Sequence, residues 1–318
     1  MESGKLIISL DFELLWGGLG LSDINLYKKT VLGGRHAIPK MLDMFEKYGI
    51  HATWATVGIV GLDGKKQLLK NIPNIKPHYK KRFYSAYEHF DEIGNSEKED
   101  PYSYAPSLVR LILSKENQEL GTHTFAHYYC NEEGADQESF RQDLIASISI
   151  MKEFYGVDIT SLVFPRNQSK EEYVKVAQDL GITCWRGNPA GYKISNSKIV
   201  NLIQRILRLV DSYIPVYGNL CTSMDVYSVS GCCMASRFFR PYNQKLKFLE
   251  SLKIQRIKNQ MLYAAKNHKV FHLWWHPHNF GENTEIMLEQ LETILMYYEE
   301  LKIKFGYESI NMREYSNR

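Results

Sequence analysis

Apolar runs alternate with amphipathic segments along most of this chain. A short apolar run at 6–10 (LIISL) predicts a buried strand. Residues 35–48 carry apolar side chains at helical spacing and are followed by Gly49, a typical helix stop. Residues 51–58 (HATWATVG) return to strand character. The order strand, helix, strand is the repeating unit of a parallel sheet, whose buried strands are apolar nearly throughout.

The same alternation continues through the rest of the sequence. Apolar runs predict strands within ELGTHTFAH, at 161–165, 182–185 and 269–275, and in a short final segment, YESIN. Amphipathic periodicity predicts helices at 137–155, 171–181, 197–210, 244–266 and 284–302. Six or seven such units in 318 residues predict an α/β fold, a distorted and incompletely closed (β/α) barrel of about six or seven parallel strands.

Two segments interrupt this regularity, at about 62–118 and 211–242. We interpret them as insertions into a single catalytic domain that extends over residues 1–318. The first is rich in Lys, Asn, Glu, Tyr and Pro, so it either shapes a substrate cleft or forms a solvated surface loop.

The composition narrows the class of protein. Charged residues are 24% of the chain and the net charge is only +3, without a Lys/Arg run, which argues against a nucleic-acid binder. No stretch approaches the ~20 apolar residues that span a bilayer, and the first segment lacks a secretory signal. Five cysteines with no disulfide-like spacing favour a reducing, cytoplasmic location. The oligomeric state stays open.

Polar side chains with metal-binding chemistry follow two of the predicted strands. Asp11 and Glu13 end the first strand, and two residues apart on an extended segment they point the same way. His123 and His127 lie between a strand and a helix. Two imidazoles and one carboxylate are a typical ligand set for a single divalent ion, zinc above all, that keeps a position for water. The alternative for the acidic pair is two surface carboxylates.

Two further strand ends carry basic side chains. Arg166 in FPRNQ would hold Asp11 ionised and oriented if the two lie close together. His276 and His278 follow the strand KVFHLWW, and either could donate a proton to a leaving group. The alternatives are an ordinary surface arginine and two structural or exposed histidines.

These motifs, in this order, resemble the polysaccharide deacetylase family, carbohydrate esterase family four, which includes chitin-oligosaccharide and peptidoglycan deacetylases. The segments that carry the resemblance are SLDFE, HATWATVG, THTFAH, FPRNQ and LWWH. The resemblance implies that His123 and His127 are metal ligands and Asp11 is the general base. It also implies that Arg166 tethers Asp11 and that His276 is the general acid.

One departure from the family pattern concerns the acidic motif. The family usually has adjacent aspartates, the first a base and the second a ligand, whereas Phe12 occupies the second position here. Glu13 is the natural substitute as metal ligand, and the roles of Asp11 and Glu13 could also be exchanged.

The sequence therefore predicts a metal-dependent hydrolase that removes an acyl group, acetyl first, from an N-acylated sugar or glycan. One alternative is a hydrolase of a non-sugar C–N bond in an amide, ureide or formamide. Another is a non-catalytic glycan-binding protein on the same fold. In the loop SRFFRPYN, Arg237 or Arg240 could meet an anionic group of the substrate.

Overall fold

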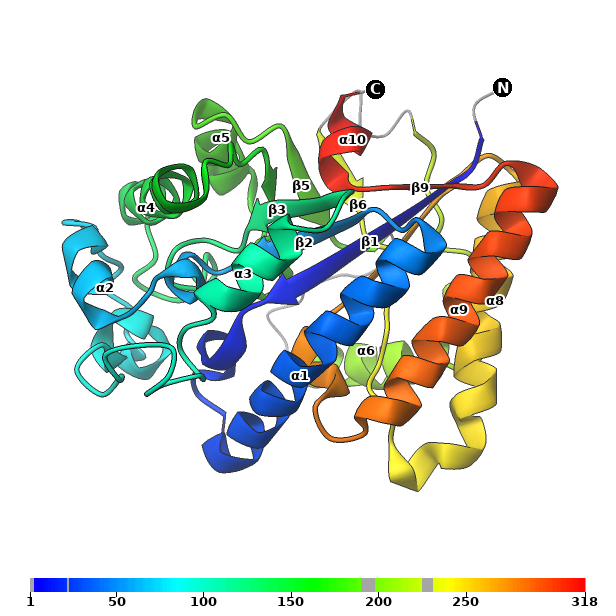
Figure 1. Cartoon of the computed structure of the whole chain (residues 1–318), viewed down its shortest axis with the longest axis horizontal. Coiled ribbons are helices and arrows are strands. Elements are labelled where there is room, and N and C mark those ends of the chain that lie inside the picture. Colours follow the sequence, from blue (N-terminus) through cyan, green and yellow to red (C-terminus); the bar gives the residue numbers. More distant parts are fainter. Residues whose placement is uncertain (1–2, 22, 190–197, 225–230, 318) are drawn as a thin grey trace.

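The structure is a computed structural model that describes residues 3–21, 23–189, 198–224 and 231–317. Its strands form one parallel sheet in the order β6-β5-β4-β3-β2-β1-β8-β7, and β9 pairs with β1 (Figure 1). The strands are β1 (Lys5–Phe12), β2 (Ala52–Thr56), β3 (Gln118–Thr122), β4 (Ser161–Leu162), β5 (Cys184–Gly187), β6 (Cys232–Met234), β7 (Arg237–Phe238), β8 (Val270–Trp275) and β9 (Glu308–Ile310).

The sheet is an open, curled half-barrel, which confirms the predicted architecture. Eight strands lie on its continuous path instead of six or seven, because the segment 211–242 contributes β6 and β7. These strands are three and two residues long, so they are too short to show a periodic pattern. Within the described ranges, β6 and β7 do not pair with each other, and the barrel stays open.

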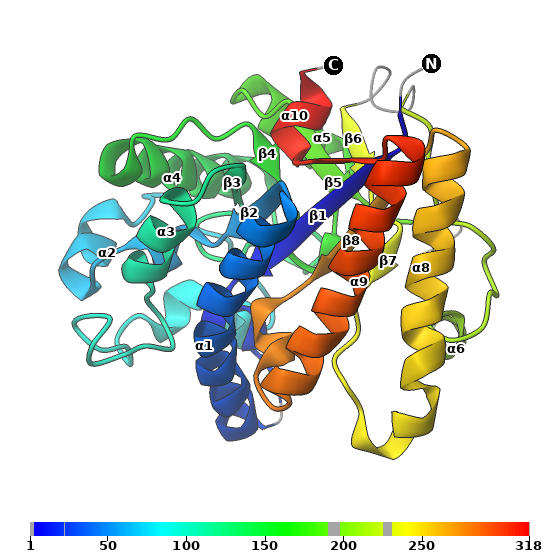
Figure 2. The same ribbon diagram turned by 45° about the vertical axis from the view of Figure 1, so that its right-hand side comes forward.

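Helices cover the outside of the sheet, and α1, α9 and α8 lie side by side along it (Figure 2). The helices are α1 (Ile24–Tyr48), α2 (Lys65–Asn71), α3 (Pro106–Leu113), α4 (Gln137–Tyr155), α5 (Glu171–Asp179), α6 (Lys198–Asp211), α8 (Glu250–Lys266), α9 (Thr284–Phe305) and α10 (Met312–Ser316). None of the helices in the described ranges is long and apolar enough to cross a membrane.

The core lies between β1, β2 and β8 and the helices that cover them. Phe45 of α1 packs against Trp54 of β2 and Trp275 of β8, with ring centroids 6.2 Å from each, and all three side chains are fully buried. Burying one such side chain contributes about 1.5–3 kcal/mol. Strand β1, on which the first candidate residues lie, runs between β2 and β8 and pairs with both.

Helix α1 begins eleven residues earlier than its apolar pattern predicts. The Asp23 side chain caps it by accepting a hydrogen bond from the Leu26 amide. The early part carries Gly33 and Gly34, which weaken a helix in isolation. Here they allow close packing, because a Cβ on Gly34 would come within 2.7 Å of the His278 Cα atom. The helix is thereby held directly behind the segment that carries His278.

Candidate active site

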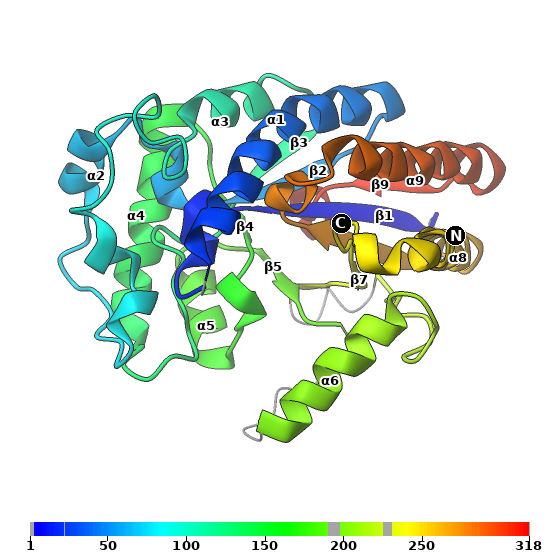
Figure 3. The ribbon, with the colours of Figure 1, turned by 90° about the horizontal axis from the view of Figure 1, so that it is seen from below.

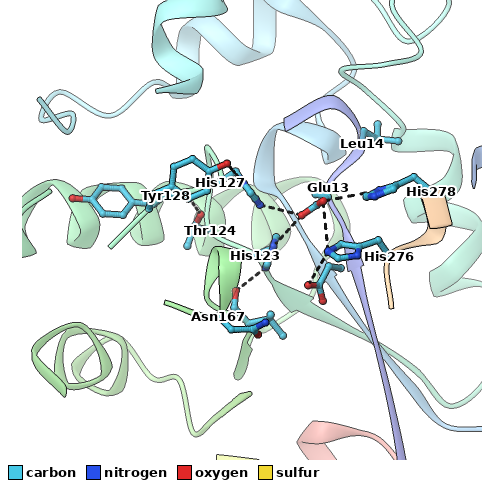
Figure 4. A network of polar contacts seen from close by, with 12 residues as sticks. Glu13, Leu14, His123, Thr124, His127, Tyr128, Asn167, His276 and His278 are labelled. Atoms are coloured by element: carbon cyan, nitrogen blue, oxygen red, sulfur yellow. Dashed lines mark hydrogen bonds and ion pairs between the residues drawn. The ribbon is translucent and has the colours of Figure 1, made fainter. Parts of the chain in front are cut away.

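The site lies at the carboxyl ends of β1, β3, β5 and β8, where side chains from separate segments converge (Figure 4). Asp11 occupies the penultimate position of β1, and Glu13 follows the strand directly. Both carboxylates are buried, with 3% and 5% exposed. Phe12 between them points to the opposite face and packs edge-on against Trp54. The alternative interpretation, two surface carboxylates, would require both side chains to be exposed. It is therefore wrong.

The two histidines lie in a loop of unusual backbone conformation. His123 directly follows β3, and both Thr124 and His127 have positive φ angles, 64° and 54°. The buried Asp143 carboxylate of α4 stabilises this turn by accepting a hydrogen bond of 2.7 Å from the Phe125 amide. This strained turn brings the second imidazole back towards the first.

Glu13, His123 and His127 form a group suited to one metal ion. One carboxylate oxygen and one ring nitrogen from each imidazole all lie within 4.8 Å of one another. Glu13 Oε2 is 3.0 Å from His127 Nε2 and 3.3 Å from His123 Nε2. The structure thus brings together the three residues expected as ligands.

The hydrogen bonding of His123 favours a cation at this position. Its Nδ1 donates to the Val163 carbonyl oxygen over 2.7 Å, so the neutral ring presents the lone pair of Nε2. This Nε2 atom is buried and has no hydrogen-bond partner in the described part of the chain, although it faces a carboxylate oxygen. The lone pair of His123 Nε2 and that of the Glu13 carboxylate oxygen thus point to the same place, where a divalent ion can accept both.

The electrostatics keep Glu13 and His127 in the form that binds a metal. Burial lowers the pKa of His127 to about 4, so its imidazole is neutral at physiological pH. Burial by itself raises the pKa of Glu13, but the neighbouring His276, His123 and His127 bring it well below its ordinary value. A carboxylate and two neutral imidazoles are the protonation states that zinc requires.

Asp11 is held by an arginine that the sequence interpretation did not select. Arg186 of β5 donates two hydrogen bonds to this carboxylate, Nη1 to Oδ1 over 2.6 Å and Nη2 to Oδ2 over 2.7 Å. Burial by itself raises the pKa of Asp11. The Arg186 guanidinium, together with His123 and His276, has the larger effect, so the pKa lies below its ordinary value. The side chain of Asp11 is therefore ionised and fixed in orientation.

Arg166, which we expected to tether Asp11, points elsewhere. It lies in a short 3₁₀ turn with a φ angle of 54°, and its guanidinium stacks on Tyr129 at 4.0 Å and Tyr84 at 4.6 Å. Its ion-pair partner is Glu132, at 3.6 Å. The expected contact with Asp11 is thus wrong, because the turn rotates the side chain away from the sheet.

The neighbour of Arg166 contributes instead. Asn167 Oδ1 accepts hydrogen bonds from Arg186 Nη2 at 3.0 Å and from Nε at 3.2 Å, and the Trp274 ring lies 4.1 Å from the guanidinium. Arg186 directly follows the predicted strand ITCW. Its position at a strand end, like that of Asp11 and His276, is the sequence signal that could have identified it.

His276 and His278 both face the carboxylates, at different distances. His276 Nε2 is 3.5 Å from Asp11 Oδ2 and 3.7 Å from Glu13 Oε1. His278 Nδ1 is 4.0 Å from Glu13 Oε1, and burial lowers the pKa of His278 to about 3. The two rings stack with centroids 4.8 Å apart. His276 therefore lies nearer to Asp11, and His278 is neutral.

Comparisons with known proteins concern the family and the fold. The sequence profile of the family described as "Polysaccharide deacetylase" matches residues 30–185, which include His123 and His127. No curated protein matches the sequence significantly.

Solved structures share the fold. A structure from Mycobacterium smegmatis, assigned by name to the polysaccharide deacetylases, aligns over 100% of this chain and 90% of its own, with a TM-score of 0.56 at 12% identity. A second structure named as a probable polysaccharide deacetylase, from Pseudomonas aeruginosa PAO1, aligns over 99% of this chain and 89% of its own. Its TM-score is 0.53 at 9% identity. At these identities the likeness concerns the fold alone.

Proposed function

We propose that this chain, which belongs to the polysaccharide deacetylase family, is a metal-dependent hydrolase that removes an acyl group, acetyl first, from an N-acylated sugar. Family membership supports deacetylase activity in general. The observation that carries the proposal is the buried group of Glu13, His123 and His127 beside an ionised Asp11.

The metal site fits one divalent ion, with zinc as the first candidate. Two imidazole nitrogens and one carboxylate oxygen would hold it, and the unpartnered Nε2 of His123 is the clearest sign of the fit within the described ranges. Such an ion polarises an amide carbonyl and lowers the pKa of water to about 7. Since Phe12 points into the core, Glu13 takes the ligand position and leaves Asp11 free for proton transfer.

The remaining residues divide the proton transfers between them. Asp11 accepts the proton of the attacking water, and Arg186 keeps this carboxylate ionised until the transfer. His276 donates a proton to the departing nitrogen, since its Nε2 lies 3.5 Å from Asp11 and faces the same space. His278 packs behind His276 and orients its ring.

The test is acetate release from a panel of N-acetylated sugars and oligosaccharides. We expect activity with the zinc-loaded protein, loss after chelation and recovery on adding the metal. Activity on small ureides or formamides, with none on sugars, would favour the non-sugar alternative. Metal binding without hydrolysis of any of these compounds would favour the non-catalytic, glycan-binding alternative.

We also propose a cytoplasmic location. All five cysteines are free, including Cys184 and Cys233 on the neighbouring strands β5 and β6. Free thiols fit a reducing compartment. Cell fractionation tests the location, and recovery of the protein from an oxidising compartment would contradict it.

A further inference from the structure

A tyrosine that the proposed function does not use contacts one of the expected metal ligands. His127 Nδ1 lies 3.1 Å from the hydroxyl oxygen of Tyr129, and the two rings pack edge to face with centroids 5.1 Å apart. The Nε2 atom of the same imidazole lies 3.0 Å from Glu13 Oε2, and the ring points towards that carboxylate (Figure 4). Both nitrogens of this buried ring therefore have a polar neighbour, one on the metal side and one behind it.

The two neighbours of His127 differ in their hydrogen-bond chemistry. A neutral imidazole has one N–H and one lone pair. An ionised carboxylate only accepts hydrogen bonds, so the contact with Glu13 is a hydrogen bond when the ring proton is on Nε2. A cation in the same place needs the lone pair of Nε2, and the ring proton is then on Nδ1. The partner of Nδ1 must therefore donate in the first tautomer and accept in the second, and a phenol hydroxyl can do both.

The other expected histidine ligand is held differently. His123 Nδ1 lies 2.7 Å from the carbonyl oxygen of Val163, and a carbonyl oxygen only accepts hydrogen bonds. This contact selects the tautomer that has its lone pair on Nε2. At His127 the corresponding partner is the hydroxyl of Tyr129, which permits either tautomer. The metal-binding tautomer of His127 therefore depends on this hydroxyl as the acceptor of its proton.

Surrounding side chains fix the position of the Tyr129 ring, which is fully buried. The Arg166 guanidinium lies over the ring at 4.0 Å from its centroid, and Tyr84 packs edge-on with centroids 5.7 Å apart. The backbone amide of Tyr129 donates a hydrogen bond of 2.8 Å to the hydroxyl of Tyr79, which is also buried. A hydrogen-bond partner that orients a metal ligand has to be held in place in this way.

Two of these contacts come from the first segment that interrupts the predicted alternation, at about 62–118. Tyr79 and Tyr84 lie between α2 and α3, and this part of the chain is on the same side of the molecule as α4, away from α8 and α9 (Figure 3). The sequence left open whether the segment shapes a substrate cleft or forms a solvated loop. Both tyrosines pack on Tyr129, with ring centroids at 6.4 Å and 5.7 Å. The segment therefore supports the loop that carries His127.

We propose that Tyr129 is a positioning residue for the metal ligand His127. Its hydroxyl accepts the Nδ1 proton, so that the lone pair of Nε2 faces the ion. Tyr79, Tyr84 and Arg166 act through Tyr129 by fixing its ring. The inference rests on the proposed function for the presence of a divalent ion. It does not depend on hydrolysis, because it concerns metal binding only.

Removal of one hydroxyl group tests this role. Tyr129→Phe keeps the ring and its packing, but the Nδ1 proton of the metal-binding tautomer loses its acceptor. We expect the zinc affinity to fall by about 10–100-fold, the usual effect of losing such a partner. Competition with a chromophoric zinc chelator measures the affinity without any turnover.

The neighbouring tyrosine provides a matched control. Tyr128 is equally buried, and its hydroxyl lies 2.8 Å from Ser139 Oγ and 2.9 Å from the Asp136 carbonyl oxygen, not beside a metal ligand. Tyr128→Phe should leave the zinc affinity unchanged. Both variants remove one buried hydroxyl, so a general loss of stability cannot distinguish them, whereas the zinc affinity does.

The proton on His127 can also be observed directly, in NMR spectra of the protein with isotope-labelled histidines. The His127 signals are assigned by comparison with His127→Ala. In the zinc-loaded protein we expect a proton on Nδ1 with a downfield shift and slow exchange with water, because it is hydrogen-bonded to Tyr129. In Tyr129→Phe at saturating zinc the signal should move upfield and exchange faster, and in Tyr128→Phe it should not change. A purely structural role of Tyr129 would not affect this proton.

Three outcomes would overturn the inference. The first is an unchanged zinc affinity in Tyr129→Phe. The second is an equal loss of affinity in Tyr128→Phe, which would assign the effect to loosening of the loop. The third needs no variant and so applies even if Tyr129→Phe does not fold. It is a zinc-loaded protein in which the Nδ1 proton of His127 exchanges rapidly with water.

Failure of the proposed function would look different. In that case zinc would bind and Tyr129→Phe would weaken its binding as described, but no N-acylated sugar would release acetate. If both ideas hold, Tyr129→Phe should need about 10–100-fold more zinc for half-maximal acetate release and should recover most of its turnover at saturating zinc. Absence of zinc binding by the unaltered protein would contradict both.

Discussion

Replacement of Arg186 by Gln tests the central electrostatic feature of the site. The guanidinium is fully buried and donates five hydrogen bonds, two to Asp11, two to Asn167 and one of 3.1 Å to Ser9. Glutamine keeps part of the volume but removes the charge, so the Asp11 carboxylate is left buried with its main counter-charge absent. Breaking a buried ion pair in this way costs about 3–5 kcal/mol.

The size of this effect should depend on pH. In the native protein the pKa of Asp11 lies below its ordinary value, so the pair stabilises the fold above the pKa of the unfolded chain, about 4. This stabilisation is lost as the pH falls through the lower native pKa. In Arg186→Gln, burial without the guanidinium should raise the pKa of Asp11. The stability gap between the two proteins should therefore be largest near pH 7 and narrow below about pH 4.

Urea unfolding of the metal-free proteins from pH 3 to pH 8 measures the gap, with acetate release as a second readout. We expect Arg186→Gln to lose activity at neutral pH and to regain part of it at higher pH, where Asp11 ionises again. Arg166→Gln is the control, because its guanidinium packs on Tyr129 and not on Asp11. A gap in Arg186→Gln that does not vary with pH, or an equal pH-dependent gap in Arg166→Gln, would refute the reasoning.

Three further predictions concern the division of roles in the site. His127→Ala and Glu13→Ala should each lower metal content from one ion per chain to well below half, measured by atomic emission, because each removes one of three ligands; full retention in both would contradict the site. Asp11→Asn should retain the metal and abolish acetate release, since only the base is lost; the opposite pattern in Glu13→Ala and Asp11→Asn would exchange their roles. His276→Ala should lower turnover by about 10²–10⁴-fold with metal content unchanged, and His278→Ala by much less; a larger loss in His278→Ala would move the acid role there.

The sequence by itself determined the strands and helices that have strong patterns. The periodic pattern of α4, which ends at Gly156, predicted that helix to the residue, and the apolar run at 6–10 predicted the central part of β1. Parallel strands end at one edge of a sheet. The predicted strands therefore also placed Asp11, Glu13, His123 and His127 in one site. These features depend on local spacing and on a general rule of topology, which a sequence contains.

Only the tertiary structure decided which arginine reaches Asp11. Arg166 and Arg186 both follow predicted strands, and the sequence does not show that Arg166 lies in a turn with positive φ or that Arg186 reaches Asp11. The short strands β6 and β7 were likewise invisible, because two or three residues carry no period. Side-chain direction at a strand end depends on backbone dihedrals and on pairing with distant segments, and neither is encoded in local spacing.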